Sequence, residues 1–182
     1  MGASQSAAPK CLVYGVPGAG RKTLVEALRK RGGDLELVLP ERASDAETTA
    51  DLLVYVLDAT KPDAWAAAAA GMLETLHSVN KAVGRLVPLV VCVNKRDFVD
   101  SAPARQVVEQ MRLTGDVCSA VGGRVWRVVD CSARRDNDVI ELGRMLRHMA
   151  DAGRSIKPSG ILAPKWRGAS SGDAQGPCAS LP

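Results

Sequence analysis

Short apolar runs alternate with longer amphipathic segments along most of this chain. The runs with the length and composition of buried strands are residues 10–14, 35–39, 52–57, 86–93 and 124–129. The segments in which apolar side chains recur every three or four positions, as in helices, are residues 21–30, 62–83, 101–113 and 138–153. Because strands and helices alternate, we predict an α/β domain with a mostly parallel sheet of about five strands and helices on both faces.

Residues at the expected helix ends support this assignment. Gly32-Gly33 follows the first helical segment and is a stop signal, and Pro62 stands where the second begins. Asp138 and Glu141 have the spacing of a capping box, so we expect the last helix to begin there. Gly153 is expected to end that helix.

The chain divides into three regions of different composition. Residues 1–9 are rich in small side chains and are predicted to be a flexible N-terminal segment, and residues 10–153 form the domain. Residues 154–182 are rich in Gly, Ser and Pro without periodicity and are predicted to be disordered. A chain of 182 residues is long enough for one such domain with a sizeable core.

Composition narrows the class of protein. Hydrophobic residues make up 46% of the chain but aromatic residues only 3%, so the core must consist of Val, Leu and Ala. The basic residues behind the net charge of +4 are scattered without interleaved aromatics, which argues against a nucleic-acid surface. No apolar stretch approaches the roughly 18 residues of a membrane span. Cys11, Cys92 and Cys131 fall in strand-like runs without a C-x-x-C pair, which is typical of buried thiols in a reducing, cytoplasmic compartment, and no metal site is predicted.

A glycine-rich segment follows the first predicted strand. Residues 10–14 run directly into Gly15, Gly18 and Gly20, with Ala19 between the last two, and a helical segment follows. Glycines let the backbone approach a phosphate closely, and the first amides of a helix point at such an anion. Strand, glycine-rich turn and helix together therefore predict a phosphate-binding loop.

The residues after this turn depart from the P-loop pattern. The spacing from Gly15 to Gly20 is correct, but Arg21 and Lys22 stand where Lys and then Ser/Thr should follow. With one inserted residue, Lys22-Thr23 would be the functional pair. Without it, Arg21 replaces the phosphate-binding lysine and Lys22 the magnesium-binding hydroxyl. We adopt the register without insertion, because it keeps the apolar residues of the helix on the sheet side.

Two further polar segments follow predicted strands. Asn94-Lys95-Arg96-Asp97 comes after the strand at 86–93, and Cys131-Ser132-Ala133 comes after the strand at 124–129. Parallel sheets bind ligands at the carboxyl ends of their strands, so we expect both segments to meet the glycine-rich turn at one edge. A carboxylate at Asp97 accepts both the ring N–H and the exocyclic amine of guanine, a pattern that adenine does not offer.

In this order the segments resemble the small GTPases, and within them the Arf/Arf-like branch. Residues 20–24, Gly-Arg-Lys-Thr-Leu, align without gaps to that branch's Gly-Lys-Thr-Thr-aliphatic run, and residues 50–60 are similar to its central strand. Trp126 shortly before Cys131 also fits. The likeness covers residues 10–150 apart from one gap. It implies a truncated Ras-like P-loop fold and GTP or GDP as the ligand.

The resemblance also implies roles for the matching residues. Asn94 would bond the major-groove edge of the purine, Lys95 would lie along the base plane, and Asp97 would select guanine. The backbone after Cys131, at Ser132-Ala133, would meet the guanine carbonyl. The residues implied around the phosphates are Gly15, Gly18, Ala19, Gly20, Arg21, Lys22 and Thr23.

The gap in the resemblance concerns the catalytic parts. Gly20 and Asp58 lie 38 positions apart, far fewer than the resemblance leads one to expect, and the missing part corresponds to the switch regions and one edge strand. No Asp-x-x-Gly occurs between Gly33 and Gly71, so no glycine amide is available for a γ-phosphate. Phosphoryl transfer depends on positioning and charge stabilisation by those parts. We therefore assign no catalytic residue.

Arg21 and Lys22, the two cations after Gly20, also argue against a catalytic site. An ammonium at Lys22 does not ligate Mg²⁺ and repels it, so the metal is not expected. Arg21 and Lys22 also oppose the dipole of the helix N-terminus, by roughly 0.3–1 kcal/mol each, and a bound phosphate would relieve this. Two interpretations stay open: Lys22 substitutes in part for the metal's charge, or the pocket has decayed and is empty.

Three functions follow from these expectations. The first is an Arf-like guanine-nucleotide-binding pseudo-GTPase that acts as an interaction module in membrane-associated trafficking. The second is a working GTPase that borrows catalytic groups from a partner. The third is a scaffold that binds protein partners and no nucleotide.

The N-terminus carries one further pattern. Gly2 with Ser6 fits the N-myristoylation motif, although a start rich in small residues also matches it by chance. If Gly2 is acylated, we expect a peripheral protein on the cytosolic face of a membrane. Its membrane association should not depend on GDP or GTP, because the region that slides between the switches in Arf-like proteins is largely missing.

Overall fold

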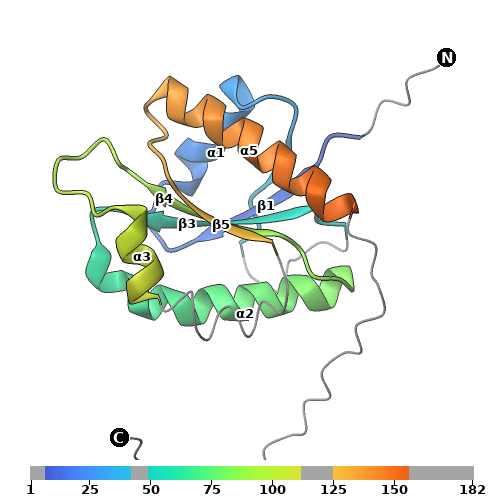
Figure 1. The fold of residues 1–182 in the computed structure, drawn as a ribbon, viewed down its shortest axis with the longest axis horizontal. Coiled ribbons are helices and arrows are strands. Elements are labelled where there is room, and N and C mark those ends of the chain that lie inside the picture. The colour runs from blue at the N-terminus through green and yellow to red at the C-terminus, as the bar shows by residue number, and fades with distance from the viewer. Residues whose placement is uncertain (1–6, 42–48, 112–124, 156–182) are drawn as a thin grey trace, which may run out of the picture.

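The computed structural model describes residues 7–41, 49–111 and 125–155 (Figure 1). Its centre is a five-stranded sheet in the order β2-β1-β3-β4-β5, and every neighbouring pair is parallel. The strands are β1 (Lys10–Gly15), β2 (Glu36–Val38), β3 (Leu52–Asp58), β4 (Leu89–Asn94) and β5 (Trp126–Asp130). The predicted parallel α/β sheet is confirmed.

Helices cover both faces of this sheet (Figure 1). One face carries α1 (Arg21–Arg31) and α5 (Asp136–Ser155); the other carries α2 (Trp65–Val83), preceded by the 3₁₀ turn η2 (Pro62–Ala64), and α3 (Ala104–Gln110). Each face has its own apolar core. Leu24 and Leu28 of α1 pack on the first face with Leu146 of α5, and Trp65 and Met72 of α2 are fully buried on the second.

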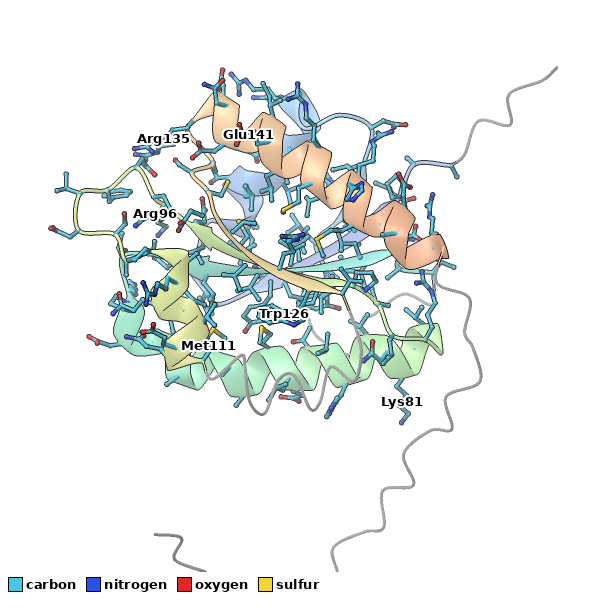
Figure 2. All side chains as sticks on the ribbon, in the orientation of Figure 1. Lys81, Arg96, Met111, Trp126, Arg135 and Glu141 are labelled. Carbon is cyan, nitrogen blue, oxygen red and sulfur yellow. The ribbon has the colours of Figure 1, made fainter. Side chains whose placement is uncertain are left out.

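Burial follows from this layered arrangement. All residues of β3 and β4 are buried, because both faces of these central strands are covered by helices. The edge strand β5 is only partly buried. Its first residue, Trp126, lies between the sheet and α2 (Figure 2). β4 begins at Leu89, three residues later than predicted, after Pro88, which has no N–H to donate to a ladder.

The prediction for the last helix is wrong at both ends. α5 begins at Asp136, two residues before the expected start, and continues through Gly153. Asp138 does not act as the predicted cap; its Oδ2 accepts a hydrogen bond from the Ser132 N–H at 2.9 Å. Gly153 lies within the helix at a point of close packing, where a Cβ would lie 2.4 Å from Pro88 Cγ. The glycine marks a close approach, not an end.

The end of α5 is tied to the amino-terminal side of the sheet. Arg154, at which the sequence predicts the start of the tail, donates hydrogen bonds to the Ala7 carbonyl at 3.0 Å and to Asp51 Oδ2 at 2.6 Å. Asp51 also accepts from the Lys10 N–H at 3.0 Å and pairs with Arg85 at 3.2 Å. The segment before β1 is therefore held at the sheet side opposite the strands' carboxyl ends.

Three cysteines lie in the core, as predicted. Cys11, Cys92 and Cys131 are free thiols and fully buried. Burial and the nearby charge of Asp51 raise the pKa of Cys11 to about 12. Contact with the Cys131 thiol, together with burial, raises the pKa of Cys92 well above its usual value. Neutral thiols of this kind pack as small apolar groups.

Candidate functional site

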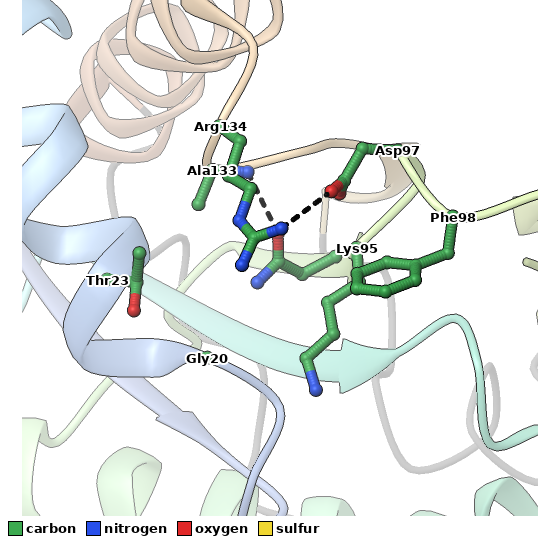
Figure 3. A pocket seen from close by; sticks show the side chains of 8 residues that line it. Gly20, Thr23, Lys95, Asp97, Phe98, Ala133 and Arg134 are labelled. Atoms are coloured by element: carbon green, nitrogen blue, oxygen red, sulfur yellow. Dashed lines mark hydrogen bonds and ion pairs between the residues drawn. The ribbon is translucent and has the colours of Figure 1, made fainter.

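The carboxyl ends of β1, β4 and β5 lead into one cavity of about 190 Å³ (Figure 3). The residues that line it are Gly20, Thr23, Asn94, Lys95, Asp97, Phe98, Ala133 and Arg134. They come from all three segments that the sequence predicts to converge. The expected meeting of these segments at one sheet edge is therefore observed.

The glycine-rich turn is held against the sheet at both of its ends. Gly15 has a φ of +147°, and a Cβ there would lie 2.2 Å from the Val56 carbonyl oxygen of β3. Gly20 has a φ of +83°, and its Cβ would lie 2.7 Å from Asn94 Nδ2. Both positions require glycine, because a side chain would be strained and would also clash. The turn therefore has the tight path that a phosphate-binding loop needs.

The start of α1 faces this turn with amides that the helix does not use. α1 begins at Arg21 directly after Gly20, where the register without insertion places its first residue. The N–H of Leu24 bonds the Gly20 carbonyl at 2.9 Å, so the amides of residues 21–23 have no acceptor within the helix. Thr23 lines the cavity, whereas the exposed Lys22 does not. These amides are the part of the site suited to an anion.

Asn94 links the glycine-rich turn to the loop after β5. Its side chain is 2% exposed, its Nδ2 donates to the Ala19 carbonyl at 2.8 Å, and its Oδ1 accepts from the Ala133 N–H at 3.1 Å. Ala19 is itself fully buried. Asn94 thus fastens two of the three converging segments to each other. The resemblance implies that the Asn94 side chain also bonds the purine.

The Lys95 ammonium has a partner within the protein, so its side chain does more than lie along a base. Its φ is +70°, unusual for a residue with a side chain, and its Nζ lies 2.7 Å from Asp58 Oδ2 at the end of β3. Asp58 is 2% exposed, and its other oxygen accepts two hydrogen bonds from Thr60. Burial raises the pKa of Asp58, but the bonds from Lys95 and Thr60 outweigh it and hold that pKa below its usual value. Lys95 is therefore held at the end of β3, with its Cε 3.9 Å from where a Cβ on Gly20 would lie.

Asp97 faces the cavity from the loop after β4 (Figure 3). Its Oδ1 accepts a hydrogen bond from the Ser132 hydroxyl at 2.8 Å, and its Oδ2 lies 3.6 Å from Arg134 Nη1. Partial burial raises the pKa of Asp97, but the hydrogen bond from Ser132 and the charge of Arg134 lower it by more. The pKa therefore lies below its ordinary range. Asp97 is thus a carboxylate at neutral pH, the form that accepts hydrogen bonds.

The backbone amides of the loop after β5 donate hydrogen bonds to side chains of the protein. The Ser132 N–H bonds Asp138 and the Ala133 N–H bonds Asn94, while the Arg134 N–H bonds the Ser132 hydroxyl at 3.2 Å. Cys131 has a structural role beneath this loop: it is fully buried, and its carbonyl accepts the Arg96 N–H at 3.1 Å. The backbone predicted to meet a guanine carbonyl is therefore at the cavity wall, with its donors already bonded within the protein.

Sequence reasoning missed three residues of this site. Phe98 and Arg134 line the cavity, with the Arg134 guanidinium 5.8 Å from the centre of the Phe98 ring, and Asp58 holds Lys95. Their positions directly after predicted strands and next to the recognised motifs were the available signal. The pairings themselves depend on neighbouring strands and are not visible in the sequence.

The residues present fit a guanine nucleotide better than they fit its metal. The turn offers backbone amides for phosphates, and Asp97 offers a carboxylate for the base. For Mg²⁺ the oxygen donors are poor, because the Asp58 carboxylate is engaged by Lys95, and in the register without insertion Lys22 stands at the hydroxyl position. Within the described ranges no cluster of three or more His, Cys, Asp or Glu side chains is present.

The fold and this arrangement of motifs define a small-GTPase-like P-loop protein, and comparisons with known proteins agree. Residues 44–150 match the model of the ADP-ribosylation factor family. The structure is similar to signal recognition particle receptor SRb from Chaetomium thermophilum, solved with GDP and Mg. That likeness has a TM-score of 0.59 and 15% identity over 80% of this chain and 99% of the other. SRb with GDP alone gives a TM-score of 0.58 and 14% identity, at the same coverage.

Because the family match spans more than half of the sequence, the chain belongs to the ADP-ribosylation factor family. The predicted resemblance to the Arf branch is confirmed. The matched range contains Asn94–Asp97 and Cys131–Ala133 but begins after the glycine-rich turn. None of the helices described is both long enough and apolar enough to span a bilayer.

Proposed function

We propose that this protein binds guanine nucleotides without hydrolysing them and offers an Arf-like surface to protein partners. The observation that carries the proposal is Asp97, a carboxylate at the wall of a cavity that the glycine-rich turn also lines. A guanine placed there would give Asp97 two parallel N–H donors, while adenine would give it none in the same place.

The absence of hydrolysis is argued from the phosphate side of the site. In the register without insertion, Lys22 replaces the hydroxyl that would hold Mg²⁺, and Asp58 is occupied by Lys95 at 2.7 Å. Between Gly33 and Gly71 the sequence also lacks an Asp-x-x-Gly segment to sense a γ-phosphate. Catalysis of phosphoryl transfer needs these groups in place, so the chain lacks the means to hydrolyse GTP alone.

The direct test is to ask which nucleotide the protein carries and which one stabilises it. Purified protein is denatured and the released nucleotides are separated by chromatography, and the melting temperature is measured with GDP, GTP, ADP or ATP. We expect guanine nucleotides alone to be released and to raise the melting temperature. Equal stabilisation by GTP and ATP would contradict guanine recognition.

A nucleotide-free scaffold is the second candidate, and one observation favours it. The Asn94 side chain and the Ala133 amide, both expected to contact the base, bond each other at 3.1 Å. If no nucleotide is released and none changes the melting temperature, the scaffold replaces the first proposal. Magnesium-dependent GTP turnover that is lost on Lys22→Ala or Thr23→Ala would instead establish the inserted register and an active enzyme.

The membrane part of the proposal rests on Gly2 and the residues after it. Residues 3–9 contain no cysteine and no positive charge, so a myristoyl chain there has no second anchoring signal in that segment. One such chain binds membranes only marginally, with a constant of about 10⁴ M⁻¹. We therefore propose weak, reversible attachment that supports a trafficking role only through a partner's contacts.

Vesicle co-sedimentation of acylated protein, loaded with GDP or GTP, tests this attachment beside a Gly2→Ala control. We expect weak binding that is equal for both nucleotides and absent in the control. Tight binding with GTP alone would show that a working switch survives, and the pseudo-GTPase proposal would be rejected.

A further inference from the structure

The Arg134 side chain lines the cavity beside Asp97. Its Nη1 is 3.6 Å from Asp97 Oδ2, and its guanidinium lies 5.8 Å from the centre of the Phe98 ring. Figure 3 shows the guanidinium beside Asp97, with a dashed line marking their ion pair. Arg134 is thus held in the cavity by a charge on one side and an aromatic ring on the other.

The chemistry of this contact matches that of the expected ligand. The edge of guanine that carries its ring N–H and exocyclic amine is itself a guanidine fragment, with parallel N–H donors in one plane. An arginine side chain presents the same kind of planar donor fork to a carboxylate. The Asp97 oxygen that Arg134 faces is Oδ2, because Oδ1 already accepts the Ser132 hydroxyl.

We propose that Arg134 stands in for guanine on Asp97 in the nucleotide-free protein and must swing out before a base binds. Arg134 is therefore a residue that sets both the affinity and the selectivity of the base site. This inference rests on the guanine-binding function proposed above. It adds an internal competitor, which the family resemblance does not assign.

The exposure of Arg134 makes this exchange feasible. Its side chain is 73% exposed, whereas that of Asp97 is 20% exposed. The guanidinium leaves the cavity by rotation about its own side-chain bonds, without movement of the loop backbone. The backbone N–H of Arg134 remains bonded to the Ser132 hydroxyl, so the loop keeps its support when the side chain moves.

The expected effect is modest, because an exposed ion pair contributes little. Removing Arg134 should tighten guanine binding about two- to fivefold, the range that such pairs are worth. The effect should appear with guanosine as well as with GDP, since it concerns the base. It should be absent for adenosine, which carries no ring N–H and no 2-amino group to donate to Asp97 in the place of guanine.

The test compares Arg134→Ala with Arg135→Ala. The control also removes one positive charge, but Arg135 is the next residue and its side chain does not line the cavity. Affinities for guanosine, GDP and adenosine are measured by calorimetry on the full chain. The pKa of Asp97 is followed by carbon NMR in the same proteins without nucleotide. We expect tighter guanosine binding and a higher Asp97 pKa in Arg134→Ala, with smaller pKa changes and no tighter binding in Arg135→Ala.

Each other outcome overturns a different statement. An Asp97 pKa that is equal in wild type and Arg134→Ala would show that the contact is not formed in solution, and the inference would fail whatever binds. A raised pKa with unchanged or weaker guanosine affinity would show that Arg134 does not compete with the base, while guanine binding itself stands. No binding to either protein at any concentration would reject the proposed function and the inference with it.

Discussion

The cavity has two ends that differ in the groups they contain. The base end holds Asn94 and Asp97, and the phosphate end holds the glycine-rich turn and the start of α1. At the base end, Asn94 and Asp97 have hydrogen-bond partners at 2.8–3.1 Å, and the family match covers both. At the phosphate end the turn has its glycines and free helix amides, but Arg21 and Lys22 follow them. Under the proposed function, the chain keeps a carboxylate for guanine, whereas the register without insertion places a lysine where the metal-binding hydroxyl would be.

The difference has a physical basis. The base-end residues also hold the fold together, because Asn94 joins the turn to the loop after β5 and would leave buried polar groups unpaired if replaced. In the register without insertion, the position of the metal-binding hydroxyl has no such second role, since Lys22 there is exposed. The proposed function therefore separates a base site that the fold needs from a metal position that it does not need.

The largest effect should come from Asp97→Ala. The change removes a charge-assisted pair worth roughly 1.5–3 kcal/mol, so GDP affinity should fall by about ten- to a hundredfold. Calorimetric titration with GDP and ADP measures it. Asp100→Ala, which removes an exposed carboxylate three residues later, is the control and should leave both affinities unchanged. An affinity for GDP that survives Asp97→Ala would place base recognition elsewhere.

Gly20→Ala and Gly18→Ala form a pair that probes the contact between the two ends. Both glycines have positive φ, so either alanine should lower the free energy of unfolding by about 1 kcal/mol. Only at Gly20 does the new Cβ also meet Asn94 Nδ2, at 2.7 Å, which should cost about 1–3 kcal/mol more. Urea unfolding of both variants gives the difference. Equal losses in the free energy of unfolding would show that Gly20 and Asn94 are not in close contact.

Asp58 should contribute to stability in a pH-dependent way. Its folded pKa is lowered, so its contribution is complete above its unfolded pKa of about 4 and disappears as the pH falls through the folded value. Asp58→Asn should lower the free energy of unfolding by about 1–3 kcal/mol at neutral pH and flatten its decline in acid. Urea unfolding between about pH 3 and pH 7 tests this.

The matched control for that experiment is Asp63→Asn, at an exposed position near the start of α2. It should keep the wild-type pH dependence and lose less than about 0.5 kcal/mol. If Asp58→Asn follows the wild-type curve in acid, the ion pair with Lys95 does not contribute, and Lys95 is free to serve the base.

The smallest effect is expected from magnesium. With Lys22 at the hydroxyl position, EDTA should change the GDP affinity of the wild type by less than about twofold, and no GTP turnover should be measurable. Lys22→Thr supplies an oxygen ligand and should make GDP binding stronger in Mg²⁺ than in EDTA. Lys30→Thr, in the last turn of α1, should not. Magnesium dependence in the wild type would remove the contrast between the two ends.

Residues that belong to a local sequence pattern could be predicted, whereas residues paired across different strands could not. Gly15, Gly20, Asn94, Asp97 and Ala133 were found from spacing and from their place after strands, because parallel strands must bring their carboxyl ends to one edge. Arg134 and Asp58 were not, since nothing local distinguishes one charged residue after a strand from another.

The sequence by itself determined the alternation of strands and helices, and thereby the parallel sheet with two covered faces. It did so because apolar periodicity reports which side chains must leave water, a local property. The ends of α5 were decided only by tertiary structure. Gly153 lies inside the helix where Pro88 approaches too closely for a Cβ, and Asp138 accepts a hydrogen bond from the Ser132 amide instead of capping the helix. The same holds for Lys95 with Asp58 and for Arg134 with Asp97: such pairs depend on which strand ends become neighbours, and that is settled by the sheet as a whole.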